Sequence, residues 1–114
     1  MNVFALPLPP TTNGLYKNIP RGRALTSRYK SWRKSAGWEL ITQSPKRMTG
    51  PVIINYEITT KAKGDPDNYL KALNDILVAH RIIEGDGPNI VKQIDVKLSN
   101  EVARGVRVTI KEAA

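Results

Sequence analysis

The spacing of apolar side chains along the chain predicts two helices. Ser27 is suited to cap the first, which is expected to run to about Thr42 although Gly37 weakens the pattern. Its apolar stripe is formed by Tyr29, Trp32, Ala36 and Leu40. Asp67 is suited to cap the second helix, which is expected to run to about His80. The stripe of this helix is formed by Leu70, Leu73, Ile76 and Leu77.

Alternating and β-branched positions predict four strands. They are expected at residues 2–6, 51–60, 94–98 and 106–110. Residues 11–26 are polar and rich in turn-forming residues, so they are expected to be a loop. The order strand, helix, strand, helix, strand, strand indicates an α+β fold with two main helices and a mostly antiparallel or mixed sheet.

Chain length and composition narrow the class of protein. A chain of 114 residues is expected to form a single domain, residues 1–114, with a modest core. It has no cysteine, which excludes disulfides and thiolate metal sites. Because it has neither a secretory signal nor an apolar run of about 20 residues, we expect a cytoplasmic protein with no membrane partner.

Positive charge is concentrated in the first half of the chain. The net charge is +8, and residues 1–50 hold nine basic side chains against Glu39 alone, whereas the charges of residues 51–114 cancel. A basic surface attracts polyanions, through neutralised phosphates and released counterions. The distribution therefore favours nucleic acid as the partner.

Carboxylates gather around the start of the second predicted helix. Asp65 and Asp67 flank Pro66, and Lys71 follows Asp67 by one helical turn, so that both can face the same place. Two carboxylates this close suit a hard cation such as Mg²⁺. A third carboxylate, Asp86, lies between two glycines, which let a backbone approach a ligand closely.

Each of these features also has a purely structural interpretation. An aspartate before a helix is a common cap, Gly-Asp-Gly is a common turn, and an exposed ion pair contributes little. Their combination with a basic amino-terminal half favours an enzyme acting on nucleic acid. The competing hypothesis is a basic DNA- or RNA-binding module without catalysis.

The chain resembles the RusA family of phage and prophage Holliday junction resolvases, the crossover junction endodeoxyribonucleases. The motif Asp65-x-Asp67-Asn68-x-x-Lys71-Ala72, followed by Asp75 and Asp86, carries the resemblance. A proline-rich opening at residues 6–13, then Tyr16, and the motif Tyr29-x-x-Trp32-Arg33 extend it over nearly the whole chain.

The resemblance implies a nuclease that resolves four-way junctions by paired nicks in DNA recombination and repair. A competing hypothesis is a nuclease for other branched DNA, such as forks or flaps. The positions that match the family's metal-binding aspartates are Asp65, Asp67 and Asp86. Lys71 matches the catalytic lysine, while Asn68 and Asp75 match recurrent positions without a defined role, Asp75 being suited to accept a structural hydrogen bond. The implied cofactor is Mg²⁺, with Mn²⁺ as a substitute, and the implied assembly is a homodimer.

The sequence departs from the family pattern in two places. Family members often carry an acidic pair at the last site, whereas Gly85 precedes Asp86 here, so Asp86 acts alone or with Glu84. The basic run before the motif is short, with only Lys61 and Lys63. The amino-terminal half is expected to compensate, through a flexible basic loop that contacts DNA with Lys17, Arg21, Arg23 and Arg28.

The distance between the carboxylates leaves three arrangements open. A helix from Asp67 to His80 is about 20 Å long, and the chain from His80 to Asp86 spans at most about 20 Å. Asp86 can reach Asp65 if the chain turns sharply and runs back along the helix. Otherwise the helix ends early, or Asp86 enters the site of the partner subunit.

Overall fold

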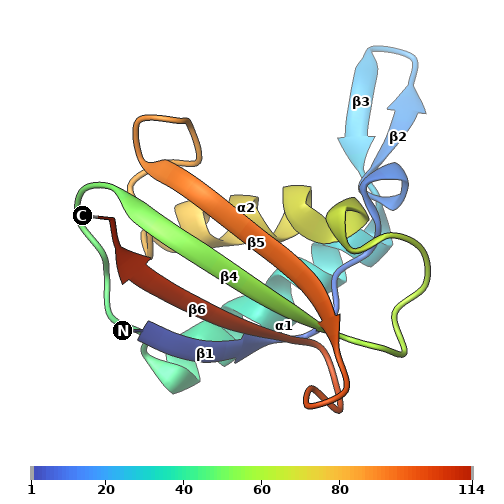
Figure 1. Ribbon diagram of the computed structural model, residues 1–114. Coiled ribbons are helices and arrows are strands. Elements are labelled where there is room, and N and C mark those ends of the chain that lie inside the picture. Colours follow the sequence, from blue (N-terminus) through green and yellow to red (C-terminus); the bar gives the residue numbers. More distant parts are fainter. Residues whose placement is uncertain (1, 114) are drawn as a thin grey trace.

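The computed structural model describes residues 2–113, whose main sheet has four strands (Figure 1). They lie in the order β1 (Asn2–Leu6), β6 (Val106–Glu112), β4 (Val52–Thr59) and β5 (Val91–Ser99). β6 pairs antiparallel with β1 and with β4, whereas β5 runs parallel to β4. The predicted strands and the mixed α+β sheet are confirmed.

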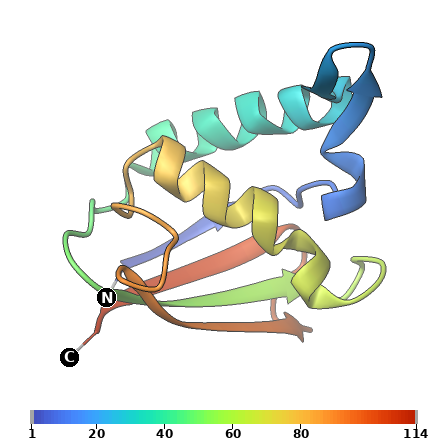
Figure 2. The same cartoon turned by 90° about the horizontal axis from the view of Figure 1, so that it is seen from above.

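Two helices, α1 (Ser27–Gln43) and α2 (Leu70–Ala79), lie on the same face of this sheet (Figure 2). α2 provides the crossover that two parallel strands require. Thr26, rather than the predicted Ser27, caps α1, because its Oγ1 accepts the N–H of Tyr29 at 3.2 Å. α1 continues through Gly37, and a Cβ there would lie 3.2 Å from ring atoms of His80. The His80 ring therefore packs closely against α1.

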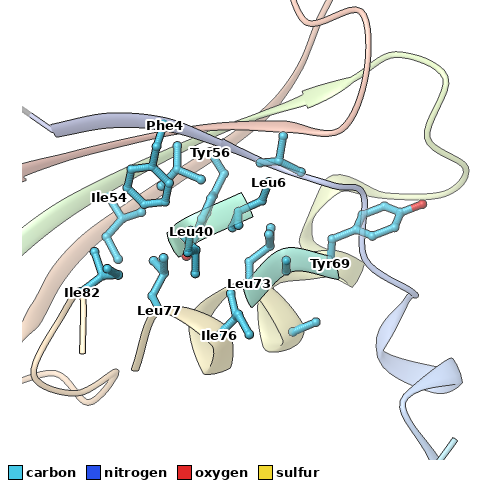
Figure 3. Packing of buried hydrophobic residues seen from close by; sticks show 14 of the residues in the cluster. Phe4, Leu6, Leu40, Ile54, Tyr56, Tyr69, Leu73, Ile76, Leu77 and Ile82 are labelled. Atoms are coloured by element: carbon cyan, nitrogen blue, oxygen red, sulfur yellow. The ribbon is translucent and has the colours of Figure 1, made fainter. Parts of the chain in front are cut away.

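The core lies between the sheet and the helices. Alternate side chains of β4 and β6 point into it, and the predicted stripe of α1 is buried throughout. On α2, Leu73, Ile76 and Leu77 are buried and Leu70 is partly buried. In Figure 3, Leu40 of α1 and Leu73 and Leu77 of α2 pack against Ile54 and Tyr56 of the sheet. No helix within residues 2–113 is both long and apolar enough to cross a membrane.

The prediction of a loop at residues 11–26 is wrong. This segment contains a 3₁₀ turn η1 (Thr12–Gly14) and a hairpin of β2 (Tyr16–Ile19) and β3 (Gly22–Leu25), which projects from the body (Figure 1). The hairpin has no face that is buried along its length, and only residues near its base are partly covered. Because no face of the hairpin is buried, β2 and β3 do not alternate apolar and polar residues, which is the pattern by which a half-buried strand is recognised.

The second helix begins later than predicted. Pro66–Tyr69 forms a 3₁₀ turn, η2, and α2 starts at Leu70. Asp67 lies inside η2, and Tyr69, at the cap position of α2, makes no capping hydrogen bond through its side chain. The predicted capping role of Asp67 is therefore wrong, and its carboxylate is exposed to solvent.

Candidate active site

Asp65 and Asp67 are exposed on a turn that is held firmly to the body. The Asn68 N–H donates to the carbonyl of Asp65 at 3.1 Å, and Thr12 Oγ1 donates to the carbonyl of Asn68 at 3.0 Å. Tyr69 is buried, and its hydroxyl donates to the carbonyl of Lys63 at 2.6 Å. The core thus anchors the turn while both carboxylates face water.

Lys71 pairs with Asp75 rather than with Asp67. Its Nζ lies 3.3 Å from Asp75 Oδ2, one turn further along α2. Asp75 is the main cause that raises the pKa of Lys71, and the charge of Asp86 adds a smaller contribution in the same direction. The ammonium group stays protonated and half exposed, with Asp75 as the acceptor that orients it. The role of Asp75 as a structural hydrogen-bond acceptor stays a prediction, and in the structure its Oδ2 faces the Lys71 ammonium.

The chain turns sharply after α2. Arg81 has a positive φ of 59°, and main-chain bonds run from Arg81 N–H to Val78 and from Ile82 N–H to Leu77. These two bonds form a Schellman motif. The Ile82 carbonyl then accepts the N–H of Met48 at 2.8 Å, which fixes the returning segment to the body.

Asp86 lies in the exposed loop between this turn and β5. Burial is the main cause that raises the pKa of Tyr56, and the charge of Asp86 raises it further. Asp86 of the same chain is therefore within electrostatic range of both Tyr56 and Lys71. Glu84, the alternative acidic partner of Asp86, accepts the N–H of Gly50 instead.

A second pair of residues, Tyr56 and Asn74, supports the site and was not predicted. The buried Tyr56 hydroxyl donates to Asn74 Oδ1 at 2.7 Å, which ties the middle of β4 to the helix face beside Lys71 and Asp75. A tyrosine at an inward position of a strand requires a polar partner. That requirement was the available signal, but the partner lies 18 residues away.

Carboxylates from the two ends of α2 do not form a closed metal cage. Asp65 and Asp67 precede the helix and Asp86 follows it. Within residues 2–113, no three acidic or histidine side chains are close enough together to hold an ion. The exposed carboxylate oxygens are nevertheless the donors that a hard divalent cation prefers, and such ions often keep several waters. The chemistry of these donors fits a hydrated divalent cation in an open site, although Asp65, Asp67 and Asp86 do not form one cluster in this structure.

The predicted DNA-contact residues lie on the hairpin and at the start of α1. Lys17 is in β2, Arg21 in the turn, Arg23 in β3 and Arg28 in the first turn of α1. The Arg23 guanidinium lies over the ring of Tyr16, 4.7 Å from its centroid. A folded hairpin and the first turn of α1 thus present the charges that were predicted to lie on a flexible loop.

Arg28 also borders a cleft between the proline-rich opening of the chain and the segment around the aspartate motif. The cleft has a volume of about 440 Å³ and is lined by Leu8, Pro9, Pro10, Thr11, Arg28, Lys61, Lys63 and Tyr69. The proline-rich opening therefore faces the short basic run that precedes Asp65. Arg28 lines the same cleft as Lys61 and Lys63 and adds its positive charge to theirs.

The model of the endodeoxyribonuclease RusA family matches residues 7–111 of the 114-residue chain. No curated protein matches the chain. The family match covers both helices, the hairpin and all of the predicted site residues. Members of this family act on branched DNA junctions and generally depend on a divalent metal. The chain belongs to the RusA family of endodeoxyribonucleases, the structure-specific nucleases that resolve Holliday junctions.

Proposed function

We propose that Asp65, Asp67 and Asp86 bind Mg²⁺, for which Mn²⁺ can substitute, and that with Lys71 they form the active site for junction cleavage. The observation that carries this proposal is the position of Lys71. The Lys71 ammonium lies one turn after the Asp65–Asp67 turn, is oriented by Asp75, and is within range of the Asp86 charge. Residues 1–114 act as one nuclease domain, in the cytoplasm of a bacterial or phage-infected cell.

Each residue has a separate task in this proposal. The metal, when bound, supplies Lewis acidity at the scissile phosphate. Lys71 neutralises negative charge that develops on the phosphate in the transition state. Asp75 keeps the ammonium group in place. Asn68 anchors the carboxylate turn through its main-chain bonds to Asp65 and Thr12.

The DNA is held by charge around the site. Lys17, Arg21 and Arg23 on the hairpin and Arg28 in the basic cleft contact the phosphates of the junction arms. Two nicks at symmetry-related strands require two active sites, so the functional unit is a homodimer with a twofold axis. In this proposal each subunit contributes its own Asp86, because the Schellman turn after α2 reverses the chain before it reaches Asp86.

Cleavage of a four-way junction, a flap and a linear duplex, each with and without Mg²⁺, tests the site. Asp65→Asn, Asp67→Asn and Asp86→Asn are each expected to lower junction nicking by orders of magnitude. Junction binding without metal should persist or tighten, because a carboxylate near a phosphate repels it. Glu39→Gln, which removes an exposed carboxylate from α1, serves as the matched control. Near-parental nicking by Asp67→Asn and Asp86→Asn would contradict the assignment.

A further inference from the structure

The two edges of the four-stranded sheet differ in how their main-chain groups are satisfied. At the β1 edge, the side-chain amide of Gln43 accepts from Ala5 N–H and donates to Ala5 C=O, both at 2.7 Å. The side chain of Asn2 likewise accepts from the N–H of Lys46 and donates to its carbonyl. Side chains and the segment after α1 therefore close this edge against another strand.

Among residues 2–113, no side chain bonds to the outer main-chain groups of β5 in this way, although η2 lies near the strand. Nine residues long, β5 is hydrogen-bonded to β4 on one side, and Figure 2 shows no element beyond its other side. Within residues 2–113, main-chain hydrogen bonds of residues 92–98 go to β4 alone. From Gln93 to Ser99 the register is regular. A long, regular and unpaired edge is a template for another strand.

The side chains of β5 are arranged so that the strand complements a second copy of itself. Two β5 strands can pair antiparallel so that Val96 of one copy lies opposite Val96 of the other. In this register, Asp95 of each copy lies opposite Lys97 of the other copy. On the other face, Ile94 lies opposite Leu98, which is 41% exposed. Directly opposite residues share a face, and opposite charges or apolar side chains there stabilise the pair.

We propose that two copies of this chain associate through β5, antiparallel and centred on Val96, to form one continuous eight-stranded sheet. The proposal deepens the homodimer of the proposed function by assigning its interface. Lys97 lies beside Glu57 of β4 in its own chain and is also on the outer edge of the sheet. A lone lysine commonly blocks edge pairing, but here it faces a carboxylate of the partner in the proposed register.

Charge reversal at two positions tests the interface and its register. Asp95→Lys and Lys97→Asp each place like charges opposite one another twice per dimer, so the dissociation constant should rise by about 10- to 100-fold. In an equimolar mixture of the two variants, every such pair is again attractive, and the heterodimer should form with near-parental affinity. Lys92→Asp is the control, because it makes the same charge change as Lys97→Asp at a position outside the Asp95–Lys97 pairs. Sedimentation velocity across a concentration series measures the parental protein, the two variants, their mixture and the control.

A covalent test is independent of charge. The chain has no cysteine, so Val96→Cys places one thiol per subunit directly opposite its copy, within the Cα separation of a disulfide. Mild oxidation should give a covalent dimer for Val96→Cys and not for Lys92→Cys.

The outcomes separate this interface from the proposed function. An unchanged dissociation constant for Asp95→Lys, or no cross-linking of Val96→Cys in a dimeric sample, places the interface elsewhere and leaves the homodimer intact. A parental protein that sediments as a monomer while it nicks junctions overturns both the dimer and the β5 interface. In that case the metal and lysine assignments still stand on the cleavage data.

Discussion

Lys71 concentrates the positive charge of the candidate site in one side chain. Lys71→Met keeps most of the apolar stem and removes the ammonium that pairs with Asp75. Junction cleavage should fall by about 100-fold or more, the usual cost of losing one donor that stabilises transition-state charge. Junction binding should weaken only slightly. Lys111→Met, on the sheet face away from the helices, is the control, and single-turnover nicking with a parallel binding assay separates the two effects.

Among the glycines of residues 2–113, Gly105 is the one whose surroundings leave the least room for a side chain. It has φ +66°, and a Cβ added there would lie 2.3 Å from the carbonyl oxygen of Leu6. Gly105→Ala should lower the free energy of unfolding by about 2–4 kcal/mol, from left-handed strain and a backbone clash. Gly14→Ala, where a Cβ meets only Pro10 at 3.6 Å, should cost much less. Equal denaturant midpoints for the two variants would contradict this explanation.

The basic residues of the hairpin and of the start of α1 predict how strongly junction binding depends on salt concentration. Replacing Arg21, Arg23 and Arg28 together by glutamine should flatten the slope of log affinity against log salt by up to about one unit for each lost phosphate contact. Arg47, Arg104 and Lys111, replaced together by glutamine, give a variant of equal net charge as a control. If both triple variants keep the parental slope in junction-binding titrations, Arg21, Arg23 and Arg28 are not the phosphate contacts.

The elements that could be predicted from sequence are those that bury a regular stripe. β4 and both helices place apolar side chains at the period of their geometry, and their existence follows from that pattern. β2 and β3 could not be found in this way, because the hairpin buries little. The start of α2 was misplaced because Asp67 has the chemistry of a cap, while Pro66–Tyr69 adopts a tighter turn.

For the candidate site, sequence spacing suggested candidate residues but did not predict which side chains they contact. Asp67 and Asp75 each lie four positions from Lys71, so spacing alone cannot choose between them. The start of α2 at Leu70 explains why Lys71 pairs with Asp75, because these two residues are then one turn apart on the same helix. The bond between Tyr56 and Asn74 depends on how α2 lies over β4, which no local pattern encodes.

At the level of the assembled enzyme, subunit mixing tests whether each subunit supplies its own Asp86. Asp65→Asn and Asp86→Asn proteins, mixed and allowed to exchange subunits, should give no recovery of nicking, because each site keeps one defect. Recovery of one working site per heterodimer would instead mean that Asp86 enters the partner's site. Exchange itself is verified with two subunits that carry different affinity tags.

The position of β6 has a consequence for how the chain folds as it is made. β6 follows every other element in the sequence, yet it lies between β1 and β4. Until residues 106–112 leave the ribosome, β1 has no strand to pair with and β4 lacks its antiparallel neighbour. Pairing Asn2 with Ile110 also closes nearly the whole chain into a loop, and such distant contacts form slowly. A ribosome-bound chain that lacks residues 106–112 therefore holds its candidate site residues on an unfinished sheet, and we expect it to cut DNA only after this strand has been made.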